Sequence, residues 1–202
     1  EDFIYHHATL DFDDPDWLAV FPFPHRLEMK TYLHEDEVCL EVTVSNTGSQ
    51  PMPLSFGFHP YFLIDPGTPE TLRMTIPLND VLEVNEVMIP TGERTPKGYL
   101  WPFENDEISL DAHRFDHGFA GQDRKRFYHF RQDGREFDLF LDNDYNYVQV
   151  YAPNRPDKPY VCIEPMLAPT NALNSGECRF LQPGANTMQA FTLSFYDEQF
   201  RE

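Results

Sequence analysis

Positive charge is scarce in this chain of 202 residues. Lys and Arg together number 15, against 34 Asp and Glu residues, which gives a formal net charge of −19. A surface with this balance repels the phosphates of nucleic acids and of anionic membranes, so neither is an expected partner. A small neutral substrate fits the charge better.

Cysteines are also few, and their number is odd. Cys39, Cys162 and Cys178 form no Cys-x-x-Cys pair, which argues against a disulfide framework and against a structural zinc site. Cys39 and Cys162 lie in apolar, strand-like runs, where a buried free thiol is common. We therefore expect a reducing, cytoplasmic location.

Several other signals are missing. No apolar run approaches the roughly 18 residues of a membrane helix, and no signal peptide is visible. Neither a Walker loop, a dinucleotide fingerprint nor a Gly-x-Ser-x-Gly motif occurs, so nucleotide binding and a serine nucleophile of that type are not indicated. Helical patterns are thin, and the best candidate is one short turn in residues 13–21.

Strand patterns dominate instead. Residues 27–34 and 37–46 alternate apolar and polar side chains around a short acidic turn, which predicts a hairpin. Residues 124–130 and 135–142 predict a second hairpin around an Asp-Gly turn. Three further segments have the composition of antiparallel strands, namely 147–153, 160–165 and 188–197.

The chain is therefore expected to be all-β, a sandwich of long antiparallel strands in a single domain of residues 1–202. Its 18 prolines are spread through the connections. No repeat, low-complexity segment or interdomain linker is visible, and the Pro- and Gly-rich residues 64–70 indicate a loop. A curved sheet of this kind can carry a ligand site on its concave face.

Glu164 is the first candidate for chemistry. It follows the apolar run 160–163, which predicts a buried strand, and Pro165 is expected to end the pairing of that strand. A buried carboxylate is costly unless its charge is shared, and burial raises its pKa from the usual value of about 4.3. A raised pKa suits a general base. The alternative is a glutamate that pairs with an arginine or caps a turn.

His59 stands in the aromatic stretch FGFHPYF, residues 56–62. Pro60 favours an extended backbone at His59, and Gly57 permits the close approach of another chain or of a ligand. An imidazole that titrates near neutrality can donate a proton. The alternative is a core histidine bonded to the backbone. Tyr61 could stack on a ligand ring, although most of the many aromatics must form the core.

Asp116 is followed directly by His117 in the segment RFDHGF. Neighbouring side chains of a strand point to opposite faces, so only one of the two would reach a given site. A metal site made of His113 and His117 would need a helix to bring positions i and i+4 together, and this segment does not look helical. Asp116 and Glu164 could also serve as the carboxylate pair of a glycosidase.

Taken together, these segments resemble one family. PMPLSFGFHPYF (residues 51–62) is similar to the Gly-x-His-Pro-Tyr-Phe signature of the aldose 1-epimerases, or mutarotases. FDHGF (115–119) resembles their Asp-His-x-Phe segment, and VCIEPMLAPTNALNSGE (161–177) resembles their glutamate motif with the loop after it. Residues 20–29 and 89–93 also resemble family segments. All occur in the family's order and span nearly the whole chain.

The resemblance implies a β-supersandwich fold and the interconversion of α and β anomers of a hexose, with no metal or organic cofactor. It implies that Glu164 removes the proton of the C1 hydroxyl and that His59 protonates the ring oxygen. Asp116 would hold sugar hydroxyls, and Tyr61 is a further candidate contact to the sugar.

Family members are longer on the N-terminal side, where they carry further strands and an arginine and a histidine that contact the sugar. The resemblance therefore implies an N-terminally truncated relative or a fragment. Absent strands would expose a sheet edge that a homo-oligomer could cover. A non-catalytic carbohydrate-binding relative is one alternative. An enzyme for sugar phosphates is another, and it would need cations such as Arg73, Arg94 or residues 124–126.

Overall fold

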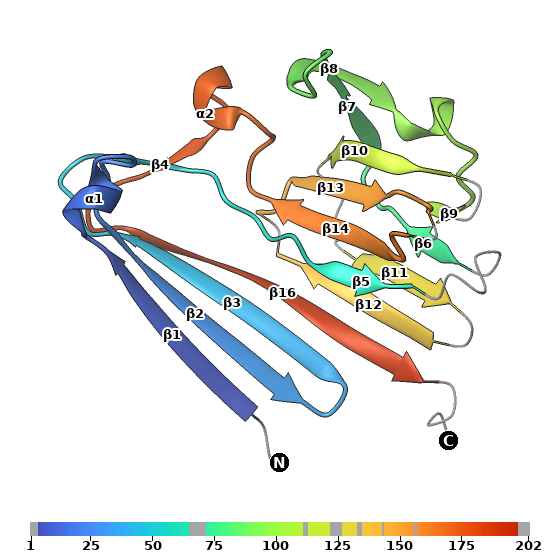
Figure 1. Cartoon of the computed structure of the whole chain (residues 1–202), viewed down its shortest axis with the longest axis horizontal. Helices are drawn as coiled ribbons and strands as arrows, with labels where there is room; N and C mark the ends of the chain where they lie inside the picture. Colours follow the sequence, from blue (N-terminus) through green and yellow to red (C-terminus); the bar gives the residue numbers. More distant parts are fainter. Residues whose placement is uncertain are drawn as a thin grey trace.

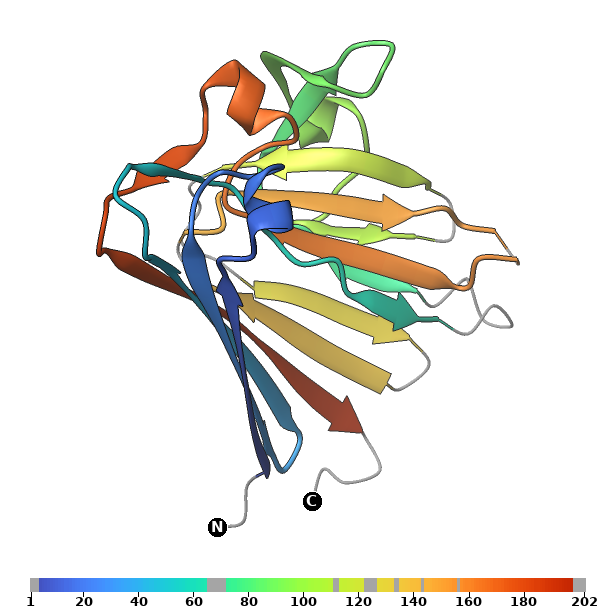
Figure 2. The ribbon, with the colours of Figure 1, turned by 60° about the vertical axis from the view of Figure 1, so that its left-hand side comes forward.

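The structure is a computed structural model that describes residues 4–64, 72–110, 113–121, 127–132, 135–142, 144–155 and 157–197. Two antiparallel sheets dominate it (Figures 1 and 2), which confirms the all-β prediction. The larger sheet has eight strands, in the spatial order β1 (Ile4–Phe12), β2 (His25–His34), β3 (Glu37–Asn46), β16 (Asn186–Asp197), β12 (Arg135–Leu141), β11 (Phe127–Gln132), β6 (Arg73–Thr75) and β9 (Glu107–Ser109).

The smaller sheet has six strands, in the order β5 (Tyr61–Leu63), β14 (Tyr160–Met166), β13 (Tyr147–Ala152), β10 (Phe115–Ala120), β7 (Asp80–Val84) and β8 (Pro90–Pro96). A separate pair joins β15 (Arg179–Leu181) to β4 (Met52–Leu54). Helical structure in the described residues is limited to α1 (Pro15–Leu18), α2 (Ala172–Ser175) and the 3-10 turn η2 (Lys97–Tyr99). None of these has the length and apolarity that a bilayer-crossing helix requires.

Local sequence accounts for the hairpins and for the first helix. β2 and β3 pair along their whole length, as predicted, and Glu35 adopts a φ of 49° in the turn between them. β11 and β12 form the second predicted hairpin, although its Asp133–Gly134 turn lies outside the described residues. α1 falls within the predicted segment 13–21, because the Asp14 carboxylate accepts a hydrogen bond from Asp16 N and Pro15 occupies the first turn.

Most of the hydrophobic core lies between the six-stranded sheet and the β12–β11–β6–β9 half of the larger sheet, and it continues to β16, to one residue of β3 and to the β4–β15 pair. Val148 and Ile163 contribute from the first, and Leu139 from the second, and all three are fully buried. The rings of Phe62 on β5 and Phe137 on β12 stack with centroids 4.6 Å apart and so join the two layers. The inner face of the six-stranded sheet is thereby packed against the core, and its outer face is available for a site.

The β1–β2–β3 ribbon extends away from this core (Figure 1). No residue of β1 is buried, and Ile4, Leu10 and Leu33 are among the exposed large apolar side chains. The ribbon joins the rest of the sheet through β16, which pairs with β3 on one side and with β12 on the other.

Candidate functional site

Glu164 lies on β14, of which one face packs in the core and the other faces away from it. Val161 and Ile163 point into the core, whereas Cys162 and Glu164 share the opposite face. The prediction that Pro165 ends the strand is wrong, because β14 continues to Met166 and Pro165 pairs with Val148 of β13. Glu164 therefore sits within a paired strand rather than at its end.

The edge of β14 that faces away from β13 explains why Pro165 is tolerated within the strand. The carbonyl of Pro165 accepts a hydrogen bond from Phe58 N at 3.0 Å, and Leu167 N donates to the Phe56 carbonyl at 3.0 Å. At Pro165 the neighbour on this side is a single bridge between Gly57 and Met166 instead of a full strand. A proline in this position removes only one backbone N–H donor, and it does so on an irregular edge. The pairing of β14 with β13 is unaffected. The same bridge carries the FGFHPYF segment to the site.

Gly57 makes this approach possible, which gives a first testable prediction. A Cβ at position 57 would overlap the Pro165 carbonyl oxygen and touch Met166. We expect Gly57→Ala to lower the free energy of unfolding by about 1–3 kcal/mol, because the two backbones would have to move apart. Gly98→Ala is the matched control, since its Cβ would meet no atom within 4 Å. Thermal unfolding measures both, and equal midpoints would contradict the prediction.

His59 and Glu164 come together at the end of this segment. The His59 Nε2 atom lies 3.3 Å from the Glu164 Oε1 atom. The imidazole stacks on the ring of Tyr61, with centroids 4.8 Å apart and the planes 6° from parallel. The histidine side chain is half exposed, whereas only 14% of the Glu164 side chain is exposed. The pair thus combines a sheltered carboxylate with an imidazole that is accessible and held flat by an aromatic neighbour.

Asp116 reaches the same face from β10. The Gln149 side-chain amide on β13 donates a hydrogen bond to Asp116 Oδ1 at 2.9 Å. Gln149 is also the cross-strand partner of Glu164. His117 points the other way, as the strand alternation predicts, and packs edge-on against Trp101 at 4.9 Å. His117 lies on a strand and His113 lies just before it, outside any helix, so the two lack the helical spacing that a metal pair at i and i+4 would need.

Strand register places the site residues in two adjacent rows. One row contains Asp116, Tyr151, Cys162 and Tyr61, and the other contains Gly118, Gln149 and Glu164. Over these rows lies an open cavity of about 430 Å³, lined by His59, Tyr61, Asp116, Gln149, Tyr151, Lys158, Tyr160 and Glu164. All four residues singled out from the sequence therefore line one cavity, whose size suits a small molecule.

The surroundings of Glu164 raise the proton affinity of its carboxylate. Burial raises the pKa of Glu164, the His59 imidazole opposes that rise, and the nearby Asp116 carboxylate adds to it. Below it, burial raises the pKa of the Cys162 thiol to about 12. Glu164 is therefore a carboxylate whose proton affinity is higher than usual, as a general base requires.

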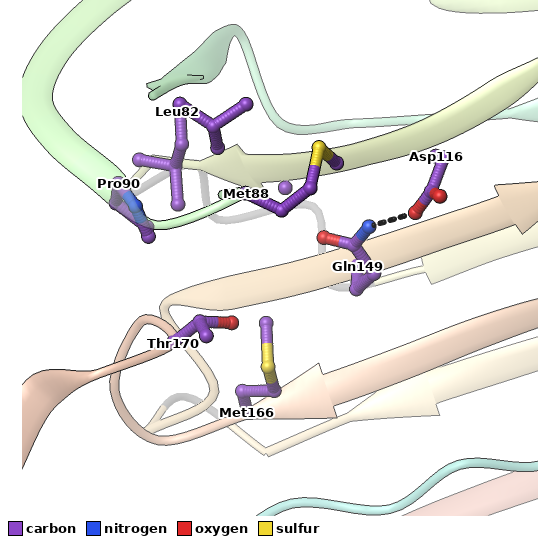
Figure 3. A pocket seen from close by; sticks show the side chains of 9 residues that line it. Leu82, Met88, Pro90, Asp116, Gln149, Met166 and Thr170 are labelled. Carbon is purple, nitrogen blue, oxygen red and sulfur yellow. Dashed lines mark hydrogen bonds between the residues drawn. The ribbon is translucent and has the colours of Figure 1, made fainter. Parts of the chain in front are cut away.

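A second cavity of about 280 Å³ adjoins the first and shares Asp116 and Gln149 with it. Figure 3 shows the hydrogen bond between these two side chains at one end, Leu82 and Pro90 at the other, and the Met88 side chain between them. Met166 and Thr170 close the lower side. The two cavities together therefore offer apolar as well as polar surfaces.

Comparison with known proteins gives this geometry a context. The sequence profile of the aldose 1-epimerase family matches residues 3–194. The chain belongs to the aldose 1-epimerase family. The matched range includes all the segments that form the site, from β4 and the His59 loop to α2.

Solved structures show that this aldose 1-epimerase family member has the galactose mutarotase-like fold. A galactose mutarotase-like protein from Clostridium acetobutylicum superposes with a TM-score of 0.83 at 19% identity, covering 98% of this chain and 64% of that one. The Slr1438 protein from Synechocystis sp. PCC 6803 gives 0.77 at 25% identity, with 98% and 63% covered. The uncharacterised protein YihR of Escherichia coli K12 is 26% identical over 145 residues, which is 68% of this chain and 44% of that protein. The chain thus spans less than two thirds of the length of these relatives.

Sequence reasoning missed several side chains that this family member brings to the cavity. Gln149, Tyr151 and Lys158 line it, and Lys158 Nζ donates to the Tyr151 hydroxyl at 3.0 Å. The alternation of residues 147–152 could have indicated Gln149 and Tyr151, because it places both side chains on one face of a strand. The sequence does not show that this is the face that carries Glu164. Of the candidate phosphate-binding cations, Arg73 pairs with Glu107 and Arg94 lies 3.9 Å from Asp80. Residues 124–126 lie outside the described residues.

Proposed function

We propose that the chain provides the acid–base site of a mutarotase that interconverts the α and β anomers of a neutral aldohexose. One observation carries the proposal: an imidazole and a carboxyl of raised pKa lie 3.3 Å apart in an open cavity of about 430 Å³. Membership of the aldose 1-epimerase family supports the reaction class. The excess of acidic residues supports a neutral substrate.

In the proposed reaction the two groups move protons in opposite directions. Glu164 takes the proton of the C1 hydroxyl, the bond between C1 and the ring oxygen breaks, and His59 gives its proton to that oxygen. The C1–C2 bond of the open aldehyde then rotates, and the reverse transfers close the ring on either face. The ionised pair becomes a neutral pair and returns to its starting state, so each turnover leaves the site with no net change in protonation.

The remaining side chains bind the sugar in this proposal. Asp116 accepts hydrogen bonds from sugar hydroxyls, and the Gln149 amide, already bonded to Asp116 at 2.9 Å, fixes its orientation. Tyr61 supports the His59 ring and offers its exposed edge to the ligand. The apolar side chains of the adjoining cavity meet C–H groups.

Polarimetry of freshly dissolved α-D-glucose and α-D-galactose tests the function. We expect the chain to accelerate the approach to anomeric equilibrium, and the Glu104→Gln variant, which alters an exposed glutamate away from the cavity, to do the same. Sugar binding without acceleration would indicate a carbohydrate-binding relative instead. Hydrolysis of a glycoside would indicate that Asp116 and Glu164 act as a glycosidase pair.

The raised pKa of Glu164 predicts the acidic limb of the pH profile. The base works only when ionised, so kcat/KM should fall as the pH drops through a pKa above the ordinary value of a glutamate. Asp116→Asn removes a negative charge that raises this pKa, and we expect the limb to move to lower pH. The position of the limb is independent of any loss of sugar affinity in the variant. An acidic limb at the same pH in Asp116→Asn and in the native chain would contradict the effect of the Asp116 charge on the pKa of Glu164.

A further inference from the structure

Cys162 occupies an unusual place for a buried thiol. It is fully buried, yet it lies on the Glu164 face of β14 and is not part of the hydrophobic core cluster. Its cross-strand neighbours are Tyr61 and Tyr151, both of which line the cavity. The thiol therefore lies behind the side chains that line the cavity, close to His59 and Glu164.

The donor atoms of three different side chains converge at this point. A ring nitrogen of His59, the Cys162 Sγ atom and a carboxylate oxygen of Glu164 all lie within 4.8 Å of one another. Among the described residues, this is the one group of three or more His, Cys, Asp or Glu side chains that could hold a metal ion. The group mixes one nitrogen, one sulfur and one oxygen donor, a combination that suits Zn²⁺ better than Mg²⁺ or Ca²⁺.

One of the three donor–donor distances already matches a tetrahedral zinc site. Bond lengths of about 2.0–2.3 Å place two ligand atoms of tetrahedral zinc roughly 3.3–3.7 Å apart. The His59 and Glu164 atoms are already 3.3 Å apart. The thiol needs to approach the other two donor atoms by at most about 1.1–1.5 Å, and the His59 ring is half exposed, so it can move toward the ion. The open cavity leaves the fourth position to water.

We propose that His59, Cys162 and Glu164 form a binding site for Zn²⁺ or a similar thiophilic divalent ion. On binding, the sulfur–hydrogen bond breaks, the sulfur–metal bond forms, and the proton goes to solvent. The ion occupies both groups of the acid–base pair, so metal binding and sugar turnover exclude each other. Metal binding stands on geometry alone, and only this inhibition rests on the proposed function.

Cobalt titration tests the site without any sugar. Adding Co²⁺ to the chain in metal-free buffer should produce the near-ultraviolet sulfur-to-cobalt charge-transfer band together with the visible bands of a tetrahedral ion. Cys162→Ala should abolish the sulfur band, and Cys178→Ala, which changes a thiol outside the cavity, should keep it. Absence of the band in the native chain, or its persistence in Cys162→Ala, would overturn the proposal.

Competition gives the affinity. Zn²⁺ should displace Co²⁺ from the native chain, and loss of the thiol should weaken Zn²⁺ binding by at least about tenfold. Cys162→Ser is a second variant for use where Cys162→Ala unfolds, since it keeps the volume and replaces the soft donor. Equal Zn²⁺ affinity in Cys162→Ser and the native chain would overturn the site. Mutarotation measured with added Zn²⁺ then separates the two ideas, because binding without any basal turnover contradicts only the proposed function.

Discussion

Glu164→Gln is expected to lower kcat for mutarotation by about 10²–10⁴-fold, the usual contribution of a positioned general base. The amide keeps the size and one acceptor oxygen of the carboxyl, but it cannot take the proton of the C1 hydroxyl. Polarimetry or NMR exchange between the two anomers measures the rate. Sugar affinity, measured by calorimetry, should stay within about tenfold, because the lost interaction belongs to the transition state.

Two comparisons make this result specific to the site. Glu104→Gln removes the same charge from an exposed position outside the cavity and should leave the rate unchanged. Glu164→Gln also removes the carboxylate 3.3 Å from His59, so its unfolding midpoint should be recorded alongside the rate. A variant that folds normally and turns over at the native rate would exclude Glu164 as the base.

His59→Asn is expected to lower kcat by about 10²-fold or more, because protonation of the ring oxygen would fall to water. The asparagine keeps a hydrogen-bond donor but has no proton to give near neutral pH. It also loses the stacking on Tyr61, so sugar affinity should weaken modestly while the rate falls far more. Anomer exchange by NMR reports the rate at saturating sugar.

The matched control is His6→Asn, which changes an exposed histidine on β1 in the other sheet. Its rate should equal that of the native chain. The double variant His59→Asn with Glu164→Gln should be little slower than Glu164→Gln alone, because two groups that act as a unit have non-additive effects. A strictly multiplicative loss would indicate that the two residues act in separate steps.

The strands were predictable because their causes are local. The alternation of residues 37–46 gave the bounds of β3 as the structure has them, and an acidic turn before them closed the hairpin with β2. The same alternation placed Asp116 and His117 on opposite faces of β10. In each case the period of two along one segment decides the outcome, and no distant residue is needed.

The site was predictable only in part, because its geometry depends on pairings between distant segments. The apolar run before Glu164 indicated a sheltered carboxylate, but residues alone do not show that β5 pairs with β14 and brings His59 to it. The family resemblance supplied that link. The prediction that Pro165 ends the strand was wrong for the same reason. Whether a proline interrupts pairing depends on its neighbour across the strand, which here is the irregular edge at the Gly57 bridge. Lys97 is a second example. It is buried, with its ammonium group bonded to the Ile76 carbonyl and to Asp106, and the residues around it in the sequence do not predict this burial.

The position of β16 has a consequence for the order of folding. Ser45 of β3 pairs with Asn186 of β16, so the ribbon of the first three strands connects to the core half of its sheet only through the last strand described. Contacts of such long sequence separation form slowly, because a large loop must close before they add stability. During synthesis, β3 keeps an unpaired edge until β16 follows, after every strand of the six-stranded sheet. That edge is therefore the part of the larger sheet most open to pairing with another chain before folding is complete.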